Sequence, residues 1–272
     1  MKKIRLLYIL FPVILGTSFA LPGCTKLTSD IVYPVASLNV VNALPNSAPL
    51  ILVQGSISLE IGQFSNITPL SYAAAAVLTP MRGSETLYAV QDNADTVSVG
   101  SKGPDFMFNG VLNFKAGNLY SLFLTGADTT TPDFLFVQDT ASVITDSAVG
   151  IRFVNLSTGS NPMSINLEGS SNASEVASLP YKGITGFKQY VNNSTTIDYL
   201  FVVRDATTGD SLTQFDFLIS GSSNNGNGLT DPSNNQYNNG HLLTFKNVTV
   251  AVYGSESSTS SSPLSTMLID NY

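Results

Sequence analysis

The chain has 272 residues, of which only 11% are charged, and 19 acidic against 12 basic residues give a formal net charge of −7. A negative chain without a basic cluster is repelled by phosphate backbones, so nucleic acid is excluded as an expected partner. Hydrophobic residues make up 43% of the chain, with 15 Phe and 11 Tyr. Such a content can fill a core and excludes a wholly disordered chain.

The first residues have the layout of a secretory signal. Lys2, Lys3 and Arg5 form a positive segment, and 6–16 is an almost unbroken apolar run. This run is shorter than the roughly 20 residues that cross a bilayer as a helix, and it is followed by small residues. The pattern predicts a signal peptide over 1–23 and therefore an exported protein.

The end of this segment resembles a lipobox, the site that the lipoprotein peptidase recognises. Leu21, Gly23 and Cys24 fit it, whereas Pro22 replaces the small residue that is usual there. Because Cys24 is the only cysteine, we expect it to carry lipid and to anchor the chain in a membrane. Ordinary signal cleavage after Ala20 is the alternative.

The rest of the chain consists of short runs of β-branched and aromatic residues between Gly, Pro, Asn and Asp. This spacing predicts strands in a sandwich or barrel, after a tether over 24–34. The stretch 72–78, with four consecutive alanines, fits either a helical turn or a strand. Examples of these strand-like runs are 37–43, 50–54, 85–92, 119–125, 134–138, 151–156, 199–204 and 248–253.

An internal repeat relates the two halves of this region. Leu-Asn-Val-Val-Asn at 38–42 matches Ile-Arg-Phe-Val-Asn at 151–155. The order of matching residues is kept along both halves, so we predict two copies of one unit, over 35–147 and 148–272. Further matched pairs are Leu70 and Tyr72 with Leu179 and Tyr181, Glu85 with Asp198, Asp92 with Asp205, Gly126 with Gly254, and Asp139 with Asp270.

Each unit has room for about seven strands, which is the size of an immunoglobulin-like sandwich. We therefore expect an all-β protein with two tandem immunoglobulin-like antiparallel β-sandwich domains after a signal peptide. The second unit also carries a segment rich in Asn, Gly and Ser over 220–239. Such a composition predicts a loop, because it cannot bury enough apolar surface to order itself.

The Val-Asn strand, the Leu-x-Tyr segment and the Gly-Ile-Arg-Phe-Val-Asn-Leu-Ser stretch at 150–157 resemble a family of bacterial lipoproteins, domain of unknown function 4397. Its members occur as tandem copies in exported proteins, notably of Bacteroidetes. The resemblance covers nearly all of the chain after the signal, and it implies β-sandwich domains in the cell envelope. It provides no catalytic residues, and the 220–239 segment departs most from it.

Catalytic and metal-binding patterns are scarce. A Ser/His/Asp triad or a zinc site would need His241, the only histidine, and its place beside Gly240 is typical of a solvated loop end. The 224–239 segment offers amide oxygens but a single carboxylate, Asp231, which is a poor calcium site. We expect no metal, no cofactor and no enzymatic activity.

Three further patterns could indicate ligand or modification sites: matched acids, tyrosines near loops, and Asp followed by Ser or Thr. The matched acids fit turn capping better than glycoside hydrolysis. Trp is absent, and Tyr181, Tyr190, Tyr199 and Tyr237 lie near loops, where a tyrosine can bind a sugar although a buried role is commoner. Asp followed by Ser or Thr resembles a Bacteroidetes O-glycosylation acceptor, although the same pairs are good turn formers. The five candidate acceptors are Thr96, Thr129, Thr140, Ser147 and Ser211.

These features favour a non-enzymatic cell-envelope lipoprotein, adhesin-like or scaffolding, held in the outer membrane by its lipid and facing either the periplasm or the cell surface. Its expected partners are the membrane and a protein or glycan ligand. The alternative function is a glycan-binding accessory lipoprotein of polysaccharide uptake. A hydrolase would require two carboxylates, or His241 with a hydroxyl and an acid, to converge in a cleft.

Overall fold

The computed structural model describes residues 34–55, 68–92, 106–144, 148–191, 198–218, 246–256 and 261–271. Within these ranges all regular structure is β-strand, which confirms the expected all-β class. The signal peptide, Cys24, His241 and the 220–239 segment lie outside the described residues. The stretch over 72–78 proves to hold a strand rather than a helical turn.

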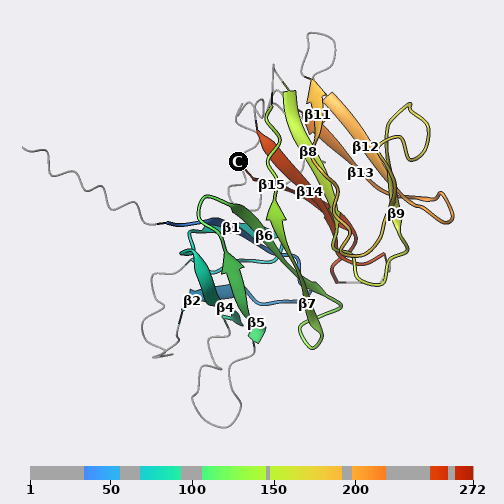
Figure 1. The fold of residues 1–272 in the computed structure, drawn as a ribbon. Helices are drawn as coiled ribbons and strands as arrows, with labels where there is room; N and C mark the ends of the chain where they lie inside the picture. Colours follow the sequence, from blue (N-terminus) through green and yellow to red (C-terminus); the bar gives the residue numbers. More distant parts are fainter. Residues whose placement is uncertain are drawn as a thin grey trace, which may run out of the picture. The chain divides into compact units, whose positions relative to one another are not determined.

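The strands form four sheets, two in each half of the sequence (Figure 1). In the first half, the order β3-β1-β6-β7 makes one sheet and β2-β4-β5 makes the other. Their bounds are β1 Ser37–Asn42, β2 Leu50–Gln54, β3 Ala74–Leu78, β4 Gly83–Gln91, β5 Phe106–Phe114, β6 Leu119–Gly126 and β7 Pro132–Asp139.

The second half has the corresponding orders, β11-β8-β14-β15 and β10-β9-β12-β13. The strand β10 stands where the first half has only a bridge between Leu50 and Leu70. The bounds are β8 Ala148–Asn155, β9 Met163–Leu167, β10 Val176–Leu179, β11 Lys188–Val191, β12 Asp198–Asp205, β13 Ser211–Leu218, β14 Asn247–Tyr253 and β15 Ser265–Asp270.

One pairing in each half differs from the expected antiparallel arrangement. The strands β1 and β6 are parallel, as are β8 and β14, while the other paired strands are antiparallel. Between the two parallel partners the chain passes through the opposite sheet, which supplies the long connection that parallel neighbours require. The registers agree too, since Leu38 faces Tyr120 and Ile151 faces Val248.

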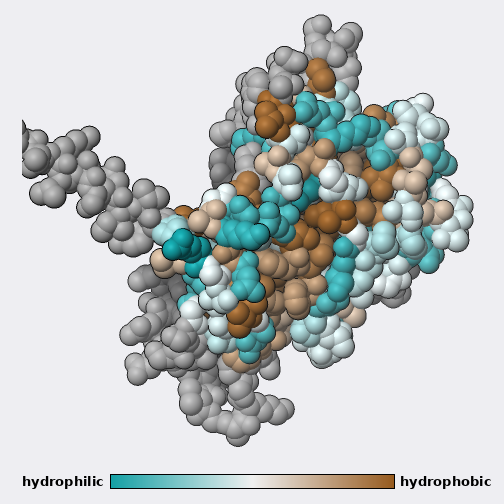
Figure 2. All heavy atoms as spheres, in the orientation of Figure 1, coloured by the Kyte–Doolittle hydropathy of each residue, from teal (hydrophilic) through white to brown (hydrophobic). Residues whose placement is uncertain are grey.

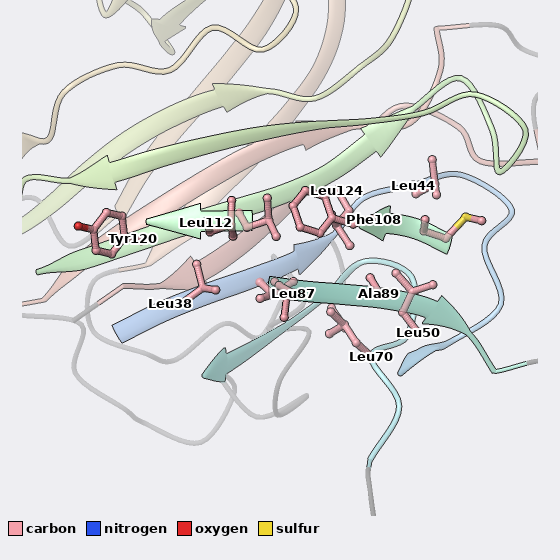
Figure 3. Packing of buried hydrophobic residues seen from close by; sticks show 14 of the residues in the cluster. Leu38, Leu44, Leu50, Leu70, Leu87, Ala89, Phe108, Leu112, Tyr120 and Leu124 are labelled. Carbon is pink, nitrogen blue, oxygen red and sulfur yellow. The ribbon is translucent and has the colours of Figure 1, made fainter. Parts of the chain in front are cut away.

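Each half encloses its own apolar core between its two sheets. Figure 3 shows the first, where Leu38 of β1 packs with Leu87 of β4, Leu112 of β5 and Leu124 of β6. In the second core, Phe201 and Phe215 stack with their ring centroids 5.1 Å apart. Burying such side chains contributes roughly 1.5–3 kcal/mol each, so these cores dominate stability.

A third apolar cluster joins the two halves. It contains Val41, Phe123 and Leu135 from the first half and Val154, Ala251 and Met267 from the second. By strand register these are three pairs of equivalent positions, so the halves contact each other through the same sheet face. The strands β1 and β8 are therefore covered on both faces, so they are buried at nearly every position, including their asparagines and Arg152, rather than at every second one. Residues Pro34–Tyr272 form one compact unit, and the division into two domains stays a prediction.

The Val-Asn motif has the same structural role in both halves. The side-chain Nδ2 of Asn42 donates to the Leu70 carbonyl at 3.3 Å, and that of Asn155 donates to the Leu179 carbonyl at 3.1 Å. Each Oδ1 accepts the N–H of the residue two positions later, at 3.2 and 2.9 Å. Both asparagines are buried, so their amides satisfy backbone groups that would otherwise lack partners.

The drawn face mixes hydrophilic and hydrophobic residues. Figure 2 shows several teal areas, pale areas of intermediate hydropathy, and a brown and tan area across the middle of the face. Among the described residues, no helix is long and apolar enough to cross a membrane.

Candidate ligand-binding site

An open hollow of about 490 Å³ lies beside the connection from β3 to β4. Its volume falls within the roughly 300–1,000 Å³ that is typical of small-ligand sites. We call it the Tyr88 hollow. Its lining comes from the end of β2, the β3–β4 connection and the first part of β4, and consists of Gln54, Gly55, Thr79, Met81, Ser84, Glu85, Thr86 and Tyr88.

The alternation of β4 places part of this lining on the outer side of the sheet. Leu87 and Ala89 are buried in the core, so Thr86 and Tyr88, which alternate with them, project from the opposite face. Tyr88 is half-buried and its ring lies 5.6 Å from that of Phe106, centroid to centroid. This contact holds the ring in place while part of it remains accessible.

Hydrogen bonds fix the rest of the lining. Glu85 Oε1 accepts the N–H of Met81 at 2.7 Å and thereby closes the β3–β4 connection. Ser84 Oγ donates to Asn113 Oδ1 of β5 at 2.6 Å. The Gly55 N–H donates to the Thr86 carbonyl at 2.9 Å and ends the β2–β4 ladder. The hollow is therefore shaped by the sheet rather than by a free loop.

The chemistry of the lining is mixed. Its residues carry an aromatic ring, a thioether, a carboxylate, a side-chain amide and several hydroxyls. By the alternation of β4 and its pairing with β2, Thr86 and Tyr88 lie on one face of the sheet and Glu85 and Gln54 on the other, so the two sets meet only at the edge where β2 ends. The amide and hydroxyls can both donate and accept, whereas the Glu85 carboxylate only accepts. No Lys, Arg or His belongs to the lining, so the hollow carries a single negative charge.

The second half has no counterpart of Tyr88. The core pair Leu52 and Ala89 occupies the same place as Ile165 and Val203, which aligns Tyr88 with Val202. Val202 is buried, and it has neither an aromatic ring nor a hydroxyl. The aromatic hollow is therefore particular to the first half.

The largest buried polar cluster that we describe lies between the two halves. Arg152 of β8 donates from Nη1 to Asp139 Oδ1 at 2.7 Å, and its side chain and that of Asp139 are 5% and 0% exposed. Its Nη2 donates to Ser121 Oγ at 3.2 Å, and its Nε donates to Thr249 Oγ1 at 2.7 Å. The guanidinium also lies over the Phe187 ring, 4.7 Å from its centroid. The guanidinium therefore links β8 and β14 of the second half to β6 and β7 of the first half.

The same register corrects one predicted correspondence. Gln138 faces Tyr120 as Asp270 faces Val248, so Asp139 corresponds to Asn271 rather than to Asp270. The side chains agree, because Ser121 donates to Asp139 and Thr249 donates to Asn271.

The other matched acids are also shifted by one residue. Asp205 corresponds to Gln91 and not to Asp92, and Glu85 corresponds to Tyr199 rather than to Asp198. Gln91 accepts the N–H of Ala48, and Asp205 accepts the side-chain amide of Asn161. Ala48 and Asn161 are themselves 113 residues apart, as Asn42 and Asn155 are, so the two contacts are equivalent. A shift of one residue moves a side chain to the opposite face of a sheet, so the predicted acid pairs are wrong.

Individually, Glu85 and Asp205 do cap turns. Asp205 Oδ1 accepts the N–H groups of Thr207 and Thr208 at 2.6 and 3.1 Å. The hydrogen bond from Asn161 and those from this turn hold the pKa of Asp205 below its usual value. These bonds tie the carboxylate to local structure.

Three of the tyrosines proposed as sugar platforms can be placed. Tyr190 is buried, and its hydroxyl donates to Glu175 Oε2 at 2.5 Å. Burial and the neighbouring carboxylate raise the pKa of Tyr190. The Tyr181 hydroxyl donates to Asp133 at 3.2 Å, and that of Tyr199 donates to the Val191 carbonyl at 2.7 Å. Their hydroxyls thus serve internal contacts, and Tyr237 lies outside the described residues.

Three of the candidate glycosylation sites are described. Asp128 Oδ1 accepts the N–H groups of Thr130 and Thr131, and the hydrogen bonds from Thr130 lower the pKa of Asp128. The Asp128–Thr129 pair therefore does form a turn. Thr129 is half-buried, whereas Thr140 and Ser211 are exposed. Thr96 and Ser147 lie outside the described residues, and modification stays a prediction for all five positions.

The acidic side chains that the structure describes do not gather into a metal site. Among the described residues, no group of three or more His, Cys, Asp or Glu side chains is placed to hold a metal ion. The hollow itself was not predicted from the sequence, since Tyr88 and Glu85 lie in an ordinary strand pattern. The only signal available was a tyrosine on the outer face of β4.

Comparisons with known proteins add little. No family model matches the chain, and no curated protein matches it. Two solved structures concern α-glucan recognition by family 41 carbohydrate-binding modules and α-glucan binding, both in streptococcal virulence factors. They are 10% and 9% identical, each cover 67% of this chain and 88% of their own, and have TM-scores of 0.23 and 0.21. A proposed adhesin from Bacteroides ovatus is 12% identical over 90% of this chain and 95% of its own, with a TM-score of 0.20. Likenesses this low carry no argument about function.

Proposed function

We propose that this chain is a non-enzymatic binding module of the cell envelope, adhesin-like or scaffolding, anchored through Cys24 and binding its ligand in the Tyr88 hollow. The hollow carries the proposal. It combines a partly accessible ring with hydroxyl, amide and carboxylate groups on a rigid sheet, as ligand sites do. Elsewhere, Asp139, Glu175 and Asp205 are committed to ion pairs or turn contacts.

The anchor rests on the sequence alone, through the lipobox-like residues before Cys24. Labelled palmitate should enter the wild-type chain and not Cys24→Ala. Label that persists in the variant would place the lipid elsewhere or show that the chain is modified by another route.

The binding role is tested with isolated envelope fractions of the producing cells. The chain from residue 24 onward, carrying Cys24→Ala to keep it soluble, should be retained by these fractions. Retention should fall in Tyr88→Ala and persist in Ser211→Ala, whose side chain is exposed at the start of β13 and does not line the hollow. Equal retention of both variants would contradict the proposed site.

A further inference from the structure

We propose that the ligand of the Tyr88 hollow is an uncharged glycan, bound through one pyranose ring packed on Tyr88. This inference rests on the proposed function and specifies its ligand class. The first argument is charge. The lining contains one carboxylate, Glu85, and no cationic side chain, in a chain whose formal net charge is −7. Sulfated, phosphorylated and uronic ligands would meet a like charge in the lining, where the one nearby cation along the chain, the exposed Arg82 between Met81 and Ser84, is not a lining residue.

The second argument is the apolar surface. Tyr88 is half-buried, and Met81 is 48% exposed at the same hollow. A pyranose ring presents C–H groups on one face, which pack on an aromatic ring and remove both from water. The Phe106 ring braces Tyr88, so little ordering is needed on binding.

The third argument is hydrogen bonding. The hydroxyls of Thr86 and Tyr88, which lie on the same face of β4, can each donate and accept. A sugar matches this lining because each of its hydroxyls is also both donor and acceptor. A peptide would instead be expected to add to a sheet edge, and β2, the outer strand of its sheet among the described residues, lines the hollow only through Gln54 and Gly55 at its end.

The two halves share a strand order, and this bears on how many glycans one chain binds. Val202 stands at the position of Tyr88 in the second half and is buried. The chain should therefore bind one glycan and not two, although both halves have corresponding sheets.

The test is titration calorimetry of the chain from residue 24 onward with Cys24→Ala. The probes are neutral gluco-, galacto-, manno- and xylo-oligosaccharides, with sulfated and uronic oligosaccharides as comparison. At least one neutral series should bind with a stoichiometry near one and with an affinity that added salt does not change. Loss of the ring in Tyr88→Ala should weaken binding by about tenfold or more and Tyr88→Phe by less than about threefold, and Ser211→Ala, at an exposed position of β13, should leave it unchanged. Matching unfolding midpoints would show that the variants are folded.

Three results would overturn the glycan inference. The chain could bind anionic oligosaccharides alone, it could bind neutral ones with the same affinity after Tyr88→Ala, or it could bind no sugar. Treatment of the envelope fractions separates this failure from that of the proposed function. Periodate, which cleaves sugar diols, should abolish the retention that depends on Tyr88. Retention that survives periodate and is lost to protease would identify a protein ligand, which overturns the glycan inference and leaves the binding role intact. Retention that never depends on Tyr88 would overturn both.

Discussion

Removing one partner of the buried Arg152–Asp139 pair should destabilise the whole unit. The two charges are 2.7 Å apart and almost fully shielded from water. Asp139→Asn keeps the shape of the side chain but removes its negative charge, which leaves the guanidinium with uncharged partners such as Ser121, Thr249 and the Phe187 ring. Breaking a buried pair in this way costs about 3–5 kcal/mol, a large part of the roughly 5–15 kcal/mol that holds a protein folded. For a unit of this size, the melting temperature should fall by roughly 6–20 °C.

Urea denaturation followed by tyrosine fluorescence and circular dichroism would measure this change. Asp133→Asn is the matched control, because the Lys182–Asp133 pair also links the halves but is 35% and 39% exposed, so its loss should cost less than about 1 kcal/mol. The double variant Arg152→Met with Asp139→Leu removes both charges and should recover most of the stability. A cost for Asp139→Asn no larger than that of Asp133→Asn, or a double variant as unstable as the single one, would refute the reasoning.

Three other changes test the fold. Gly126→Ala should cost roughly 1–3 kcal/mol in urea denaturation, because φ is 135° there and a Cβ would overlap the Thr131 carbonyl, whereas Gly186→Ala meets open space and should be near neutral. Asn155→Ala should cost about 1–3 kcal/mol by the same assay, since it leaves the buried Leu179 carbonyl without its side-chain donor; a neutral effect would show that water replaces the amide. Burial opposes ionisation of Glu175, but hydrogen bonds from Lys188 and Tyr190 hold its pKa below the ordinary 4.5. Its stabilising contribution is thus present above that value and lost as the pH falls through the lowered pKa, so Glu175→Gln should flatten the loss of unfolding free energy on the acid side, and an unchanged pH profile would contradict this assignment.

Eight of the described strands coincide with runs named from the sequence, because β-branched runs between turn residues are local signals. These strands are β1, β2, β4, β6, β7, β8, β12 and β14. The same holds for the Val-Asn motif, whose asparagines at 42 and 155 make equivalent contacts. Registers were not readable to the residue. The sequence matches Asp139 with Asp270, because both are aspartates, whereas the strand pairing makes Asn271 the equivalent residue. Which of two neighbouring residues is the equivalent one depends on the strand pairing, and the sequence alone does not give that.

Two further features could not be predicted from the sequence: the contact between the two halves, and the Tyr88 hollow. Arg152 and Asp139 lie in different sheets, and a lone arginine within an apolar strand gives no indication of its partner. The parallel pairing of β1 with β6 depends on how the chain crosses between sheets, which is a tertiary property. The hollow depends on where the β3–β4 connection lies against the end of β2, again beyond any local pattern.

Photo-crosslinking on intact cells tests the central claim most directly. A photoreactive amino acid at Thr86, inside the hollow, should give a crosslinked adduct that disappears when Tyr88→Ala is added. The same group at Ser211, an exposed position at the start of β13, should give none. Adducts formed equally from both positions, or only from Ser211, would contradict a binding module that uses the Tyr88 hollow.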